Sequence, residues 1–231
     1  METRWHLATS PDDWLKLALD RIRRAETQAL AGHGAFHIVL AGGSTPRRLY
    51  EALAREAHDW PRWQVWFGDE RCLSPEDPER NSVLASASLL LGGAIPPAQV
   101  HVIPAELGPD AAAQAYALAL GKTGDFDLVL LGLGEDGHTA SLFPGHDWGT
   151  GPDTPDALPV RDAPKPPQNR VSLSASRLSR ARQVLFLVAG AGKREAVARW
   201  QAGETLPASA ITPPGGVDVL LSPESHPGVE L

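Results

Sequence analysis

The chain of 231 residues contains one cysteine, Cys72, so no disulfide can form within it. Disulfides typify secreted proteins, and their absence makes the cytoplasm the expected location. No segment approaches the ~20 apolar residues of a membrane span. The charged N-terminus from Met1 to His6 also lacks the apolar run of a secretory signal. We therefore expect no membrane role.

Positive charge is also scarce, because 21 Lys and Arg stand against 28 Asp and Glu for a formal net charge of −7. Phosphate backbones require a basic face, so we expect no nucleic-acid partner. Any anionic ligand must be held by a local positive site. Apolar residues make up 42% of the chain, which is long enough to bury a core.

Short β-rich runs alternate with longer amphipathic stretches, a pattern typical of α/β folds. The run from Leu128 to Leu131 is apolar on both faces, as a central parallel strand covered by helices requires. Further strands are predicted at 5–7, 36–40, 64–67, 100–103, 184–188 and 217–221, and helices at 11–30, 45–57, 81–91, 110–120 and 193–200. We expect a Rossmann-like three-layer α/β fold with a mainly parallel central sheet flanked by helices.

One stretch interrupts this alternation. Seven prolines fall between Pro144 and Pro167 without periodicity, so residues 144–168 are predicted to form a long ordered loop. The sequence shows no internal repeat and no domain boundary, and we expect one domain over residues 1–231.

The first candidate site follows the strand predicted at 36–40. Gly42 and Gly43 allow close approach of the backbone to a ligand, and Ser44 and Thr45 add hydroxyls. With the N-terminus of the next helix, this turn can cradle a phosphate. The alternative is a tight turn in which Thr45 only caps the helix.

The second candidate follows the central strand, where residues 132–137 fit the pattern GxGxxG. Glu135 and Asp136 would face a pyrophosphate there, and Pro144 stops any long helix, so a dinucleotide site is not expected. The loop instead places His138 beside two carboxylates, an arrangement suited to a general base. Zinc bound by His138 and His146 is the alternative, but no third ligand has a recognisable spacing.

Two further strand ends carry charge. Arg71, in the run Asp69 to Arg71, is a candidate anion clamp, although such runs are commonly solvated. Lys193 begins a helix after a small-residue turn and is a candidate phosphate ligand, although the full P-loop pattern is absent and a surface lysine is the simpler interpretation.

Taken in order, these motifs resemble those of 6-phosphogluconolactonases. The matching runs are Ala41-Gly42-Gly43-Ser44-Thr45-Pro46, Gly68-Asp69-Glu70-Arg71, Gly132 through Pro144, and Gly190-Ala191-Gly192-Lys193. The proline-rich segment and the tail from Ser222 depart from the family pattern.

The resemblance implies a fold shared with glucosamine-6-phosphate deaminases. It also implies hydrolysis of 6-phospho-D-glucono-1,5-lactone in the oxidative pentose phosphate pathway, without metal or cofactor. His138 is then the general base, with Glu135 or Asp136 orienting it. The resemblance assigns Arg71 and Lys193 to the phosphate and Ser44 and Thr45 to the contacting loop, and it matches Arg170 to a recurrent arginine. With the residues of the motifs themselves, the expected substrate-binding set is Gly42, Gly43, Ser44, Thr45, Asp69, Arg71, Gly134, Arg170 and Lys193. The expected partner is a small sugar phosphate, and we expect a monomer.

Two other functions fit parts of this pattern. A sugar-phosphate deaminase or isomerase would share the fold, but its loop typically continues with Ile-Ala-Phe-Asn-Glu, whereas here Thr139-Ala140-Ser141-Leu142-Phe143 follows His138. A non-catalytic sugar-phosphate sensor would keep the phosphate ligands without needing His138.

Overall fold

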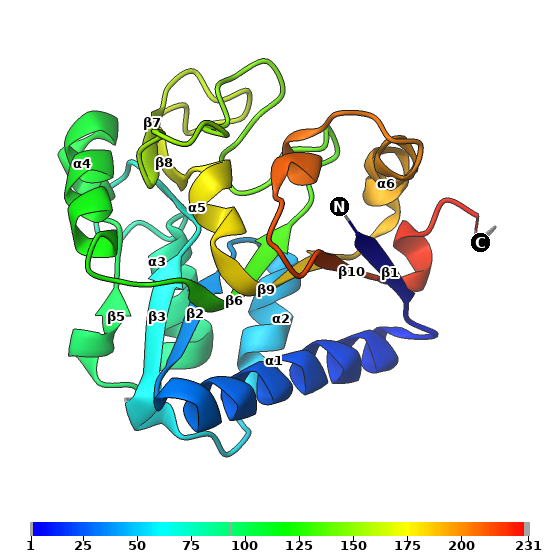
Figure 1. The fold of residues 1–231 in the computed structure, drawn as a ribbon, viewed down its shortest axis with the longest axis horizontal. Helices are drawn as coiled ribbons and strands as arrows, with labels where there is room; N and C mark the ends of the chain where they lie inside the picture. Colours follow the sequence, from blue (N-terminus) through cyan, green and yellow to red (C-terminus); the bar gives the residue numbers. More distant parts are fainter. Residues whose placement is uncertain (1, 93, 229–231) are drawn as a thin grey trace.

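The computed structural model describes residues 2–92 and 94–228. A seven-stranded sheet runs through the molecule in the order β1-β10-β9-β6-β2-β3-β5, and neighbouring strands are parallel (Figure 1). The strands are β1 (Thr3–Leu7), β2 (Phe36–Leu40), β3 (Trp63–Phe67), β5 (Val100–His101), β6 (Phe126–Gly132), β9 (Ala181–Val188) and β10 (Val217–Leu221). The predicted parallel α/β fold is confirmed.

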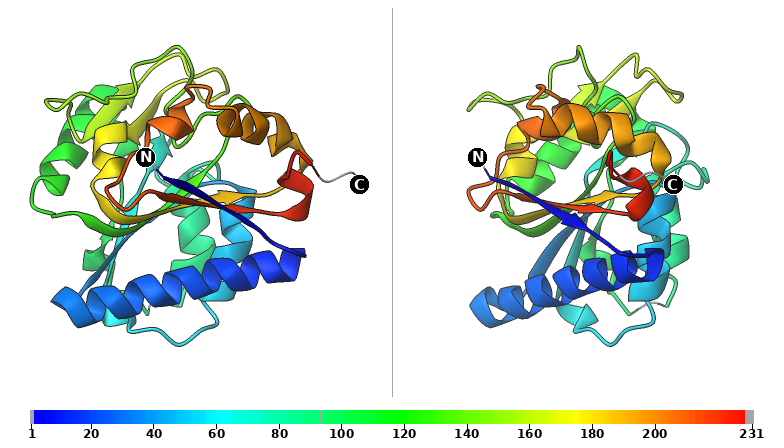
Figure 2. Two further views of the ribbon diagram at one scale, coloured as in Figure 1. Left: turned by 45° about the vertical axis from the view of Figure 1, so that its right-hand side comes forward. Right: turned by 90° about the vertical axis from the view of Figure 1, so that its right-hand side faces the viewer.

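Helices cover both faces of this sheet. Figure 2 shows α1 and α2 on one face and α5 and α6 on the other. The α-helices are α1 (Pro11–His33), α2 (Ser44–Leu53), α3 (Asn81–Ala85), α4 (Pro109–Leu120), α5 (Ala175–Ser179) and α6 (Arg194–Gln201). Across residues 2–92 and 94–228, no helix is long and apolar enough to cross a membrane.

The ends of α1 follow from local chemistry. The Ser10 hydroxyl accepts a hydrogen bond from the Asp13 amide at 3.1 Å, and Pro11 occupies the first helical position. Gly34 ends the helix in a left-handed conformation with φ 81°. The helix therefore continues to His33, three residues beyond its predicted end.

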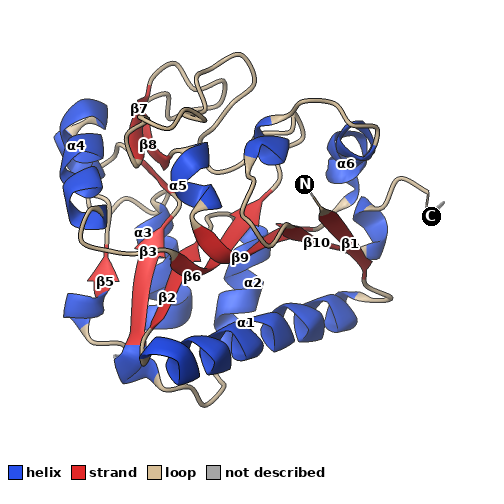
Figure 3. Cartoon of the chain, in the orientation of Figure 1, coloured by secondary structure: helices blue, strands red, loops and turns tan. Residues whose placement is uncertain are grey.

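A second, antiparallel sheet was not predicted. It has the order β4-β8-β7 and consists of β4 (Asp69–Arg71), β7 (Ala157–Val160) and β8 (Arg170–Leu173). The interpretation of residues 144–168 as loop throughout is wrong, because β7 lies inside that segment. Pro159 fits there because β7 is an edge strand, where a residue without an amide proton is tolerated. Figure 3 shows the remaining loop around β7 and β8.

The core includes the middle of the large sheet. Val129 of β6 pairs with Val39 of β2 and Val184 of β9, and all three side chains are buried. Leu185 of β9 pairs with Leu130 and is 2% exposed. The two-sided burial of β6 agrees with its predicted central place.

Leu185→Ala is expected to lower the free energy of unfolding by about 2–5 kcal/mol, because it leaves a cavity in a packed core. Leu118→Ala is the control, since Leu118 lies on α4 and is 70% exposed. Its effect should stay within about 0.5 kcal/mol. Urea denaturation measures both, and equal losses would contradict the assigned core.

Candidate active site

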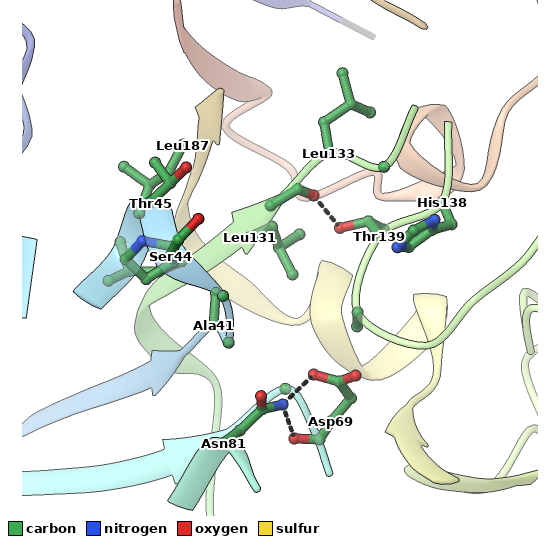
Figure 4. Close-up of a pocket in the computed structure, with 18 of the residues that line it drawn as sticks. Ala41, Ser44, Thr45, Asp69, Asn81, Leu131, Leu133, His138, Thr139 and Leu187 are labelled. Atoms are coloured by element: carbon green, nitrogen blue, oxygen red, sulfur yellow. Dashed lines mark hydrogen bonds between the residues drawn. The ribbon is translucent and has the colours of Figure 1, made fainter. Parts of the chain in front are cut away.

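A cavity of about 300 Å³ opens at the carboxyl ends of β3, β2, β6 and β9, four adjacent strands of the large sheet (Figure 4). From β2 the chain proceeds outward to β3, whereas β6 lies on the other side of β2. Open α/β sheets place ligands at such a switch point. Of the predicted site residues, Gly42, Gly43, Ser44, Thr45, Asp69, Arg71, Gly134, His138, Arg170 and Lys193 line this cavity, whereas Glu135 and Asp136 do not.

The turn after β2 forms one wall. A Cβ on Gly42 would lie 1.9 Å from Asn81 Oδ1, so only glycine fits there. Gly43, with φ 108°, is the N-cap of α2, and Ser44 is the first residue of that helix. The cap is therefore a glycine and not Thr45. The Ser44 and Thr45 side chains lie across the cavity from His138 in Figure 4.

The loop after β6 forms the facing wall through short-range hydrogen bonds. The Gly134 amide donates to the His138 carbonyl at 2.7 Å, and the Thr139 hydroxyl donates to the Gly132 carbonyl at 2.9 Å. A Cβ on Gly134 would lie 2.0 Å from His138 Nδ1. The loop therefore folds back on its own start and packs the imidazole against its backbone.

His138 is paired with Asp136. Its Nδ1 lies 2.5 Å from Asp136 Oδ1, and its backbone amide donates to the same oxygen at 3.1 Å. Burial by itself would raise the pKa of Asp136, but these hydrogen bonds and the histidine charge bring the pKa below its ordinary value. An ionised Asp136 places the proton on Nδ1 and leaves Nε2 as a proton acceptor.

Glu135 takes a different position from its neighbour. It is exposed, and a Cβ on Gly192 would lie 3.1 Å from its Oε1. Burial lowers the pKa of Lys193, and the negative charge of Glu135 offsets part of that lowering. Of the two carboxylates predicted to orient His138, the one in hydrogen-bond contact is Asp136.

Asp69 connects the walls. Its side chain is buried, with Oδ1 accepting a hydrogen bond from Asn81 Nδ2 at 2.9 Å and Oδ2 accepting one from the Ser141 hydroxyl at 2.6 Å (Figure 4 shows the first). The neighbouring Glu70 is fully buried and accepts from the amides of Asn81 and Ser82 at 2.7 and 2.9 Å. The acidic pair is buried and hydrogen-bonded, so it is not a solvated charge run.

Four cationic side chains line the cavity: Arg71, Lys165, Arg170 and Lys193. Burial, more than any other cause, lowers the pKa of Lys193, and Lys165 contributes in the same direction. Lys165 was missed in the sequence. It lies among Pro164, Pro166 and Pro167, and no strand end or periodicity marks it.

Arg170 holds the proline-rich segment in place. Its Nε donates to the Pro167 carbonyl at 3.0 Å and its Nη2 to the Lys165 carbonyl at 2.9 Å. Its guanidinium carbon also lies 5.5 Å from the centre of the Phe143 ring, which packs 4.8 Å from the His138 ring. Arg170 therefore couples the Lys165 segment to the surroundings of His138.

The described residues provide no set of ligands for the zinc ion considered as an alternative at His138 and His146. Over residues 2–92 and 94–228, no three His, Cys, Asp or Glu side chains come together closely enough to hold a metal ion. The His146 ring instead lies 5.9 Å from the ring of Phe143, measured between centres.

A parallel α/β sheet with a cation-lined cavity at its switch point is the kind of site that suits a small anionic ligand. A model of the glucosamine-6-phosphate isomerases/6-phosphogluconolactonase family matches residues 9–220, and the chain belongs to that family of enzymes. A 6-phosphogluconolactonase of Synechocystis is 41% identical over 217 residues, covering 86% of this chain and 87% of the relative. The resemblance found in the sequence is confirmed.

Solved structures agree. The crystal structure of a 6-phosphogluconolactonase from Thermotoga maritima superposes with a TM-score of 0.87 at 27% identity, covering 96% of this chain and 100% of that one. A monomeric glucosamine-6-phosphate deaminase, at 21% identity and a TM-score of 0.80 over 96% of this chain and 98% of its own, shares the fold.

Gly42→Ala is expected to destabilise the protein by about 1–3 kcal/mol, because its Cβ overlaps the Asn81 amide that binds Asp69. Gly32→Ala, in the last turn of α1 with open space around it, is the control and should be neutral or stabilising. Urea denaturation compares the two variants. Equal stability of both would contradict the close approach at Gly42.

Proposed function

We propose that this protein hydrolyses 6-phospho-D-glucono-1,5-lactone to 6-phospho-D-gluconate, in the oxidative pentose phosphate pathway. The observation that carries the proposal is the His138–Asp136 pair, which stands across a cation-lined cavity from the Ser44–Thr45 helix start. The curated relatives named as 6-phosphogluconolactonases support the same activity.

The proposed reaction uses His138 as general base. Asp136 keeps the Nδ1 proton in place, so Nε2 takes a proton from water as that water attacks the lactone carbonyl. The tetrahedral intermediate collapses with cleavage of the bond to the ring oxygen, which takes the proton from the His138 imidazolium as it leaves and returns His138 to its neutral form. Backbone amides of the glycine loop or a cationic side chain are the candidates for stabilising the oxyanion.

The cationic side of the cavity is the proposed binding site for the phosphate group of the substrate. Arg71, Lys193 and the Gly42–Thr45 turn are the proposed ligands, and Lys165 joins them because its side chain lines the same cavity. Asp69 and Arg170 were expected to bind substrate. Their contacts favour a positioning role, since both are engaged with the protein.

The loop sequence favours a lactonase over a deaminase. Thr139 and Ser141 use their hydroxyls to fasten the loop to Gly132 and Asp69. No carboxylate follows His138 in the chain before Asp147. A cytoplasmic, monomeric enzyme that needs no metal or cofactor completes the proposal.

Two assays on the purified protein test the activity itself. Proton release from freshly prepared 6-phosphogluconolactone should exceed the spontaneous rate, and ammonia release from glucosamine 6-phosphate should not exceed background. An unphosphorylated gluconolactone should be a much poorer substrate. Ammonia release without lactone hydrolysis would reassign the chain within its family.

His138→Asn is expected to lower the turnover rate about 10²- to 10⁴-fold, the usual contribution of a positioned general base. Binding of 6-phosphogluconate should be nearly unchanged, because the phosphate ligands remain. Initial rates are measured with the uncatalysed hydrolysis subtracted. A folded variant that turns over within ~3-fold of the parent would remove His138 from catalysis.

Lys193→Ala should raise KM at least about tenfold with a smaller effect on kcat, because it removes a charge-assisted hydrogen bond to phosphate. Lys165→Ala should raise KM in the same direction, and Lys122→Ala, outside the cavity lining, is the control. Steady-state kinetics with the phosphorylated lactone measure KM and kcat for the three variants. An unchanged KM for Lys193→Ala would refute the phosphate assignment.

A further inference from the structure

A second cavity, of about 490 Å³, lies at the amino ends of the strands, between α1 and the starts of β6, β9 and β10. Four arginines line it: Arg4, Arg21, Arg24 and Arg182. Asp127, the second residue of β6, belongs to its lining, whereas Gly132 at the other end of β6 lines the candidate active site. These two positions are five residues apart along the strand, which corresponds to about 17 Å.

Two carboxylates anchor three of the four arginines. The Asp218 side chain, 11% exposed, pairs with Arg4 Nη2 at 2.8 Å, with His6 Nε2 at 2.6 Å and with Arg21 Nη2 at 3.4 Å. The Asp127 side chain, 2% exposed, pairs with His33 Nε2 at 2.8 Å and with Arg182 Nε at 3.3 Å. The guanidiniums of Arg4, Arg21 and Arg182 are thus paired at the groove with buried counterions.

The positive charge exceeds what these anchors neutralise. Arg24 takes part in no ion pair or side-chain hydrogen bond among the described residues. Arg182 pairs with Asp127 through its Nε atom alone, so its two Nη groups are available to a ligand. Arg21 and Arg24 are three residues apart on α1, where like charges repel. The rim carboxylate of Glu2 pairs with Arg4 alone, at 3.1 Å.

Amide groups complete the surface. Gln28 of α1 and Gln183 of β9 line the same groove, and Gln183 Nε2 donates to Gln28 Oε1 at 2.9 Å. Guanidinium forks with free N–H groups match the oxygens of phosphate, and the volume falls within the range of small-molecule sites.

We propose that this arginine groove binds a small phosphorylated anion at a second site, separate from the candidate active site. The unpaired Arg24 and the outer N–H groups of Arg21 and Arg182 contact its phosphate oxygens. Arg4, Asp127 and Asp218 hold the groove in shape. The proposal stands independently of the lactonase activity.

Calorimetric titration with inorganic pyrophosphate tests the groove. In the double variant Arg71→Ala/Lys193→Ala, which lacks two cations of the candidate active site, one binding event should remain. Adding Arg24→Gln and Arg182→Gln should weaken it at least about tenfold, because charge-assisted hydrogen bonds are lost. Arg24→Gln alone should weaken it in the same direction without disturbing the fold, since its side chain has no partner to lose.

A charge-matched control separates a site from general attraction. Arg161→Gln/Arg199→Gln removes two positive charges outside the groove lining and should leave binding unchanged. An equal loss in this control would overturn the proposal. So would unchanged binding in Arg24→Gln/Arg182→Gln, or no binding to the parent protein up to roughly 5 mM pyrophosphate.

Discussion

The buried Asp69 carboxylate is the interaction on which the candidate active site depends. One oxygen binds the Asn81 amide and the other binds the Ser141 hydroxyl, so a single side chain joins β4, α3 and the loop that carries His138. A buried carboxylate is stable only when its oxygens are satisfied, and losing one partner leaves an uncompensated group. The geometry of the cavity walls and the burial of this charge are therefore coupled.

Glycine makes the close packing around this carboxylate possible. Gly42 lets the turn after β2 meet Asn81, and Gly134 lets the loop after β6 meet the His138 imidazole. Asp136 then holds the imidazole through its Nδ1 atom. The groups assigned to catalysis are thus held by backbone contacts and one side-chain hydrogen bond before any ligand arrives, which is the condition for an efficient general base.

The central strands and the convergence of their ends were predictable because they depend on burial and on parallel order. β2 and β10 have their predicted bounds, and Gly42, His138 and Lys193 meet because parallel strands end at one edge. The second sheet was not predictable, since β4 and β7 are three and four residues long and are defined by pairing with β8. The sequence also could not tell which of the two adjacent carboxylates contacts His138. The backbone turn at Gly134 brings Asp136, and not Glu135, to the imidazole.

The position of β6 between β2 and β9 also bears on folding. The cavity joins the turn at Gly42 to Lys193, so it exists only after strands distant in the sequence have paired. Such non-local parallel pairing incurs loop-closure entropy before it gains contacts, and it forms slowly. A partly folded chain in which β2 and β3 have paired but β9 has not docked would bury apolar surface without possessing the site.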